Sequence, residues 1–143
     1  MKVITALLFT VVALSVADKK LQLKDLPAAV QRTVQAEEAN GAKIVGLSAE
    51  KAGGKTVYEV ETTVNGHTRD LVVNAAGTIV ESEEETSINA VPAAVKAALE
   101  ARGTVGKVET VTKGKTVTYE ATVEKNGKKT EVAVNALGKP IKS

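Results

Sequence analysis

The chain has no cysteine and no tryptophan, a single histidine, and only 2% aromatic residues. Without cysteine it forms no disulfide, thiolate nucleophile, zinc–thiolate site or iron–sulfur cluster. One histidine leaves little with which to build a histidine-rich metal site or a hydrolase triad. The few aromatic residues argue against nucleic-acid binding by base stacking. A formal net charge of +2 argues against a basic surface that binds the phosphate backbone of a nucleic acid. We therefore predict no enzyme activity, no cofactor, no metal and no nucleic-acid partner.

What remains is an ordinary globular composition. The 143 residues are 43% hydrophobic and 25% charged, which is too apolar for a disordered chain. This length allows one domain or two very small ones.

The N-terminus has the pattern of a secretory signal peptide. Lys2 precedes an apolar run over residues 3–14, and Ser15 and Ala17 place small residues before Asp18. The alternative, a membrane anchor, needs about 20 apolar residues, and this run is shorter. We predict a signal peptide over 1–17, a periplasmic or secreted mature chain, and no stable membrane insertion after cleavage.

The rest of the chain repeats itself. From Tyr58 and Tyr119 onward the two copies lie 61 positions apart (119 − 58), and at Pro27 and Pro92 they lie 65 apart (92 − 27). The matching segments are Leu26–Val30 with Val91–Val95, Gly54–Val57 with Gly114–Val117, Asn65–Gly66 with Asn126–Gly127, and Val73–Gly77 with Val134–Gly138. Matches in the same order indicate an internal duplication.

Each copy predicts a helix followed by a meander of strands. Leu26, Val30 and Val34 recur every four residues, which places them on one helical face. Residues 56–64 and 117–124 alternate with period two, as half-buried strands do. Asn-Gly pairs at 65–66 and 126–127 are typical of tight hairpins. Further strands are predicted at about 43–50, 68–74, 78–82, 107–113, 129–135 and 139–142.

These elements predict an α+β fold of two tandem units, each with one helix packed on a four-stranded antiparallel meander sheet. The expected boundaries are 22–82 for the first unit, 83–87 for an acidic linker, and 88–143 for the second unit. A charge run of this kind is usually a solvated connector.

At the repeats the chain resembles a known family. Leu-Pro-Ala-Ala-Val at 26–30, Gly-Lys-Thr-Val at 54–57 and Val-Asn-Ala-Ala-Gly at 73–77 resemble PepSY-like domains, also described as beta-lactamase-inhibitor-protein-like. The resemblance covers both copies and implies the helix-on-meander fold in an exported bacterial protein. It implies a non-enzymatic role in protein binding, peptidase inhibition or propeptide-like restraint. Asn74 and Asn135 replace the usual acidic turn residue, and no functional residue is carried over.

Residues that suggest chemistry have simpler interpretations. His67 follows a hairpin turn and is interpreted as a turn residue. Gly53–Thr56 lacks the spacing of a phosphate loop and precedes a strand, so it is interpreted as a turn. Tyr58 and Tyr119 are interpreted as core residues. The single histidine and the scattered carboxylates supply no catalytic set.

The remaining candidate is the sheet face that points away from the helices. The residues predicted to line it as a binding face are Glu59, Glu61, Thr63, Glu120, Thr122 and Glu124. We predict an exported binding module that engages an envelope protein through this open sheet face or an edge strand, and restrains or inhibits an envelope enzyme or peptidase. The alternative is a small structural or stress-related envelope protein, or a ligand sensor without a tight protein target.

Overall fold

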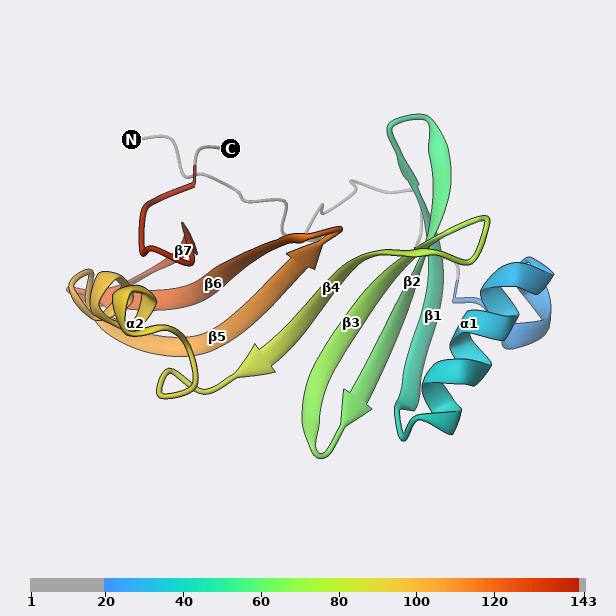
Figure 1. Ribbon diagram of the computed structural model, residues 1–143, viewed down its shortest axis with the longest axis horizontal. Coiled ribbons are helices and arrows are strands. Elements are labelled where there is room, and N and C mark those ends of the chain that lie inside the picture. The colour runs from blue at the N-terminus through green and yellow to red at the C-terminus, as the bar shows by residue number, and fades with distance from the viewer. Residues whose placement is uncertain (1–19, 142–143) are drawn as a thin grey trace. The chain divides into compact units, whose positions relative to one another are not determined.

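The computed structural model describes residues 20–141 (Figure 1). The predicted signal peptide, residues 1–17, lies outside this range. The described residues divide into two compact units at Glu84 and Glu85. The first contains η1 (Leu23–Asp25), α1 (Ala28–Ala39), β1 (Lys43–Ala52), β2 (Lys55–Val64), β3 (His67–Asn74) and most of β4 (Ile79–Thr86). The second contains α2 (Ala93–Glu100), β5 (Thr104–Lys113), β6 (Thr116–Lys125) and β7 (Lys128–Asn135).

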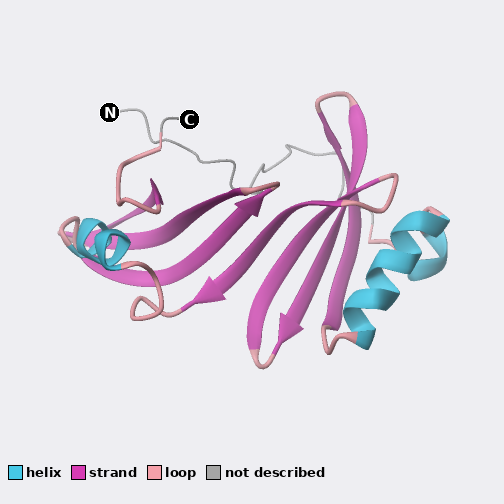
Figure 2. Cartoon of the chain, in the orientation of Figure 1, coloured by secondary structure: helices cyan, strands magenta, loops and turns pink. Residues whose placement is uncertain are grey.

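The predicted fold class, two units that each carry one helix on a four-stranded meander, is wrong. The described residues form two α-helices and one seven-stranded antiparallel sheet in the order β1 to β7 (Figure 2). Of the strand predicted at 139–142, the described residues 139–141 form an isolated bridge between Val134 and Pro140. Proline has no N–H to donate, so this segment does not extend the ladder. β4 instead continues through Thr86, into residues that the sequence analysis assigned to the linker.

The core of the first unit lies between α1 and its strands. Leu26, Val30 and Val34 present the predicted helical stripe, and all three side chains are buried. They pack against Val60, Leu71 and Val73, with Tyr58 partly buried at the margin. Along β2 and β3 these residues alternate in the predicted sense, so one face of the strands is apolar.

The second unit repeats this arrangement around α2. Val95 and Leu99 of the helix are fully buried against β5, β6 and β7. The strand residues of this cluster are Val108, Ala121, Val123, Val132 and Val134. Tyr119 packs at its margin as Tyr58 does in the first unit. Valine and alanine therefore fill both cores, and the tyrosines complete them.

Strand register is the same in the two units. Lys43 pairs with Thr63 and Thr104 pairs with Glu124, each 61 positions later. Both pairs of strands then shift register through a bulge, between Ile44 and Gly46 in β1 and between Val105 and Val108 in β5. α1 has 12 residues and α2 has 8, so the change of offset by four positions arises within the helices.

The hairpin turns use left-handed backbone where the sequence predicts them. Asn65 and Asn126 have φ of 50° and 54°, and a glycine with positive φ follows each of them. Two successive residues of positive φ give the tight turn that matches strand twist. Gly53 and Gly54 also have positive φ and connect β1 to β2, which confirms their interpretation as a turn.

Candidate functional site

The polar face of the strands is the surface opposite the helices, and we call it the open face. Tyr58 and Val60 pack toward α1, so the alternate residues Glu59, Glu61 and Thr63 lie on the open face. In β6, Ala121 and Val123 pack toward α2, and the alternate residues take the opposite face in the same way. These residues are Glu120, Thr122 and Glu124. The structure therefore places all six predicted residues on the open face of their own unit.

In the first unit the predicted carboxylates occupy different surroundings. Glu59 is half-buried, opposite Ser48 of β1 and Val72 of β3. Glu61 is exposed, opposite Gly46 and Asp70. An added Cβ on Gly46 would lie 2.8 Å from Oε2 of Glu61. The Glu61 side chain therefore lies over a position that has no side chain of its own.

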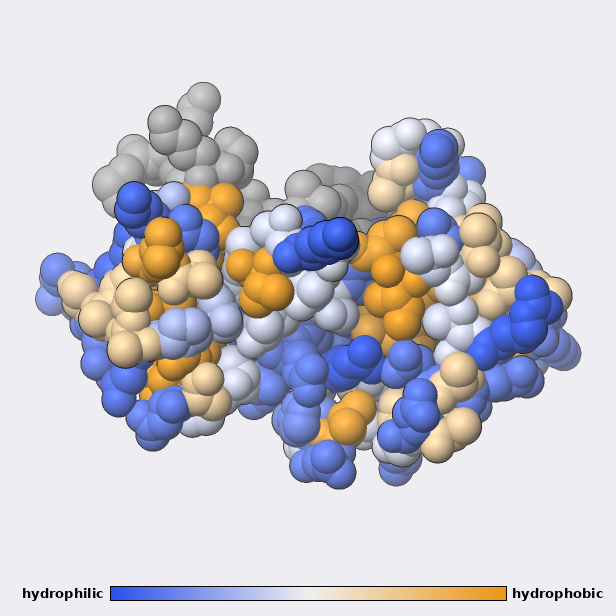
Figure 3. All heavy atoms as spheres, in the orientation of Figure 1, coloured by the Kyte–Doolittle hydropathy of each residue, from blue (hydrophilic) through white to orange (hydrophobic). Residues whose placement is uncertain are grey.

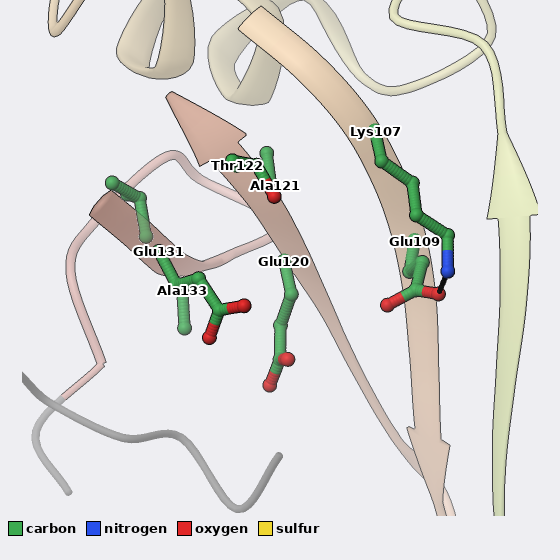
Figure 4. A pocket seen from close by; sticks show the side chains of 8 residues that line it. Lys107, Glu109, Glu120, Ala121, Thr122, Glu131 and Ala133 are labelled. Carbon is green, nitrogen blue, oxygen red and sulfur yellow. Dashed lines mark ion pairs between the residues drawn. The ribbon is translucent and has the colours of Figure 1, made fainter. Parts of the chain in front are cut away.

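In the second unit the open face is hollowed. A cavity of about 110 Å³ lies over β5, β6 and β7 (Figure 4). The side chains that line it include Lys107, Glu109, Glu120, Thr122, Glu131 and Ala133. Small-molecule sites usually enclose about 300–1,000 Å³, so this hollow suits a single protruding side chain or a few waters. Two of the predicted residues, Glu120 and Thr122, line it, and Glu124 does not.

Carboxylates dominate this hollow. Glu109 and Glu120 lie directly opposite each other on β5 and β6, and Glu120 is only 9% exposed. Like charges in such cross-strand positions destabilise a sheet. Lys107 forms an ion pair with Glu109 on its own strand, drawn as a dashed line in Figure 4. Glu131 adds a third carboxylate opposite Thr122. The hollow therefore has more acidic than basic side chains.

The residues of the first unit at the positions equivalent to this hollow differ in size and charge. Ala133 stands 61 positions after Val72, and the smaller side chain leaves room on the open face. Lys107 and Glu109 likewise stand 61 positions after Gly46 and Ser48. Sequence reasoning missed Lys107 and Glu109, because the bulge between Val105 and Val108 breaks the alternation along β5.

Within residues 20–141, no group of three or more histidine or acidic side chains is placed to hold a metal ion. No helix in this same range is long and apolar enough to cross a membrane.

His67 takes part in an ionic network on the helix side. It begins β3, and its Nε2 lies 3.0 Å from Oε1 of Glu84 on β4. Arg69 contacts the same Glu84 and donates a hydrogen bond from Nη1 to Glu37 of α1 at 2.5 Å. The histidine is thus more than a turn residue: it joins a network that links α1, β3 and β4. This network holds structural elements together and offers no nucleophile.

Large apolar anchors are scarce on the surface. The large apolar residues that are exposed in the described range are Val45, Val80, Val117 and Leu137. Ala93, Ala94 and Ala97 of α2 are also exposed, and Figure 3 shows a weakly apolar area over this helix. Strong protein interfaces centre on tryptophan, tyrosine or arginine. Among the described residues the exposed large apolar side chains are thus few and small.

Comparison with known proteins identifies a family match in the first unit. Residues 27–85 match the PepSY family, described as the peptidase propeptide and YPEB domain. This segment is less than half of the chain. No curated protein sequence shows a significant match.

Solved structures resemble the chain over most of its length. A protein of Bacteroides eggerthii, whose name proposes a periplasmic location, has a TM-score of 0.66 at 18% identity, over 82% of this chain and 86% of that one. A DUF2874 family protein of Bacteroides ovatus has a TM-score of 0.63 at 21% identity, over 82% and 85% of the two chains. A BLIP-like protein of Bacteroides fragilis has a TM-score of 0.60 at 21% identity, over 81% and 83%. At these identities the likeness establishes a shared fold.

Proposed function

We propose that this protein is an exported, non-enzymatic binding module that restrains or inhibits an envelope enzyme or peptidase. The observation that carries the proposal is the match of residues 27–85 to a family described by its peptidase propeptide. The fold shared with a BLIP-like protein supports the same class of function. The periplasmic location proposed in the name of the Bacteroides eggerthii protein is consistent with export.

Chemistry on the open face supports binding rather than catalysis. Nucleophilic catalysis needs a nucleophile, a base and a group that orients the base. The single histidine, His67, contacts Glu84 on the helix side of the sheet, away from the open face. The open face instead offers carboxylates and hydroxyls in two similar rows, Glu59–Thr63 on β2 and Glu120–Glu124 on β6. Such a surface holds a partner by charge and hydrogen bonds.

We further propose that the chain contains two copies of one ancestral unit, with the second lacking a fourth strand among the described residues. The equal register and the equally placed bulges of β1–β2 and β5–β6 support this. The equivalent positions of Gly77 and Gly138 also support it, because each glycine lies in a turn that packs on the helix of its own unit. On this proposal each copy presents its own row of open-face residues.

Site-specific cross-linking tests the proposed function. A photoreactive amino acid placed at Glu61 or Glu124 should capture a saturable, stoichiometric partner from the envelope of the native host. The matched control positions are Glu38 and Glu100, which are also exposed but lie on the helices. The purified partner should then lose activity when the protein is added. Equal capture from all four positions, or a partner whose activity is unchanged, contradicts the proposal.

A further inference from the structure

The last strand, β7, leaves one edge of its backbone largely open among the described residues. β7 pairs with β6 along its whole length. Of the residues that the structure describes, those at Pro140 and Ile141 pair with its other edge, where the N–H of Ile141 donates to the carbonyl oxygen of Ala133 at 3.1 Å. Backbone groups alternate in direction along a regular strand, so Lys129 and Glu131 point their N–H and C=O groups to the same edge as Ala133. Such an edge is a template for another strand.

In the first unit the edge equivalent to the open edge of β7 pairs with another strand. β3 stands 61 positions before β7, and its corresponding edge is covered by β4. Arg69 pairs with Glu84, Asp70 with Glu83, and Leu71 with Ser82. The residues 61 positions later are Thr130, Glu131 and Val132. The sheet edge that β4 covers in the first unit therefore recurs in the second with these positions uncovered by any described strand.

The strand that covers β3 is strongly acidic. β4 reads Ile-Val-Glu-Ser-Glu-Glu-Glu-Thr from Ile79 to Thr86. Its Glu84 lies 3.0 Å from His67, the first residue of β3. Lys128 stands 61 positions after His67, and Lys129 follows it. In the first unit His67 contacts the acidic strand β4. At the equivalent place the second unit has two exposed lysines, Lys128 and Lys129.

The opposite edge of the sheet is less suited to this role. The outer edge of β1 already receives a hydrogen bond, from the N–H of Leu21 to the carbonyl oxygen of Leu47 at 2.8 Å. At the β6–β7 turn, by contrast, Lys125, Lys128 and Lys129 are all exposed. β1 also carries exposed lysines, Lys43 and Lys51, but they stand at opposite ends of that strand. The three lysines at the β6–β7 turn lie together beside the open edge of β7.

We propose that the open edge of β7 binds an extended acidic segment of a partner protein as an added antiparallel strand. The segment takes the position that the second half of β4 takes beside β3. Its acidic side chains contact Lys128 and Lys129, and its backbone pairs with Lys129 and Glu131. This inference does not rest on the open-face proposal, because it concerns the edge of the sheet and different residues.

A synthetic peptide with the sequence of β4, acetylated and amidated, is the probe. Amide chemical shifts of the ¹⁵N-labelled mature protein, Asp18–Ser143, are recorded as the peptide is added. Binding at the proposed edge should shift the amides of β7, those of residues 128–133 most, and should weaken steeply with salt. A peptide in which lysine replaces every glutamate should bind at least tenfold more weakly. A peptide N-methylated at alternate residues, which cannot pair through its backbone, should not bind.

Two charge variants complete the test. Lys128→Glu with Lys129→Glu should weaken binding of the β4 peptide by about tenfold, since two charge contacts are lost. Lys24→Glu with Lys115→Glu makes the same change of net charge at exposed positions away from β7 and should leave binding within about twofold. The proposal is overturned if the shifts fall on β3 or the open face, if the N-methylated peptide binds equally, if no binding occurs at millimolar peptide, or if β7 instead pairs with a second copy of this chain. Glu124 lies opposite Lys129, so the independent measure of the open-face proposal is partner capture through Glu61 on β2, and failure of one proposal leaves the other standing.

Discussion

Thr33 of α1 donates a hydrogen bond from its Oγ1 to the carbonyl oxygen of Gly77, 44 residues later, at 2.6 Å. This bond fastens the turn after β3 to the helix. Gly77 has a φ of +84°, and a Cβ added there would lie 2.6 Å from the carbonyl oxygen of Ala29. Gly138 faces Ala94 in the same way in the second unit. The close approach of turn and helix therefore requires glycine for both its backbone conformation and its missing side chain.

Replacement of Gly77 by alanine should destabilise the protein by about 2–4 kcal/mol, because positive φ and a backbone clash both oppose the methyl group. Gly54→Ala is the matched control. Gly54 has a φ of +78° but no heavy atom within 4 Å of an added Cβ, so its cost should be only about 1 kcal/mol. Urea unfolding of the two variants measures the difference. Equal losses of stability in the two variants would show that the turn can move away from α1 to accommodate the methyl group without a further loss of free energy.

The tyrosine at the margin of each core should contribute less than a fully buried aromatic. Tyr119 is only partly buried beside Val95 and Leu99. Tyr119→Ala should therefore cost about 2 kcal/mol, below the usual 3–5 kcal/mol of a buried aromatic. Leu137→Ala, at a position 71% exposed, should change stability by less than about 0.5 kcal/mol. If Tyr119→Ala lowers the free energy of unfolding no more than Leu137→Ala does, the Tyr119 side chain does not contribute to the core.

The network around Arg69 should be worth more than an exposed ion pair. The Arg69 and Glu37 side chains are 24% and 15% exposed, whereas those of Lys96 and Glu100 are 40% and 54% exposed. Arg69→Met should cost about 1–3 kcal/mol, because it leaves a half-buried carboxylate without its guanidinium. Lys96→Met should cost at most about 0.5 kcal/mol. Thermal unfolding at low and high salt measures both, and only the Lys96 variant should lose its small effect in salt.

Charge reversal on the open face should weaken partner binding and leave the fold intact. Glu61→Lys with Glu124→Lys alters two exposed residues of this face, and Glu38→Lys with Glu100→Lys alters two exposed residues on the helices. The first pair should slow association with the cross-linked partner by several-fold at low salt, since rim charges act mainly on the association rate. The second pair makes the same change of net charge and is the control. Surface plasmon resonance at two salt concentrations measures both, and equal slowing would point to net charge alone.

Export should leave a shorter chain. We expect cleavage between Ala17 and Asp18, so the protein isolated from its native host should have the mass of Asp18–Ser143. Intact-mass spectrometry measures this directly. A mass that retains residues 1–17 would contradict the signal-peptide prediction.

Local patterns in the sequence predicted most of the elements. The stripe of Leu26, Val30 and Val34, the Asn-Gly turns and the alternation along β2 and β6 each depend on near neighbours in the chain, and each is confirmed. The six open-face residues were chosen from the same alternation, and their role as a binding face stays a prediction.

Long-range pairing accounts for what the sequence did not predict. Residues 83–86 are Glu-Glu-Glu-Thr and have the composition of a solvated connector, yet they extend β4. β3 supplies backbone partners for Glu83 and Glu84, a pairing between residues far apart in the chain. Residues 139–142 had the spacing of a strand, but Pro140 allows only an isolated bridge. Lys107 was not assigned to the open face because the β5 bulge changes which side chains share a face.

The placing of one tyrosine in each unit has a practical consequence for optical work. The chain has no tryptophan, and its two tyrosines, Tyr58 and Tyr119, lie at equivalent positions beside separate cores. Tyrosine emission near the usual wavelength is therefore free of energy transfer to indole. A Tyr58→Phe or Tyr119→Phe variant keeps the aromatic ring in place and removes the tyrosine fluorescence of that unit. The unfolding of each half of this molecule can thus be followed separately, with no dye attached and no foreign chromophore introduced.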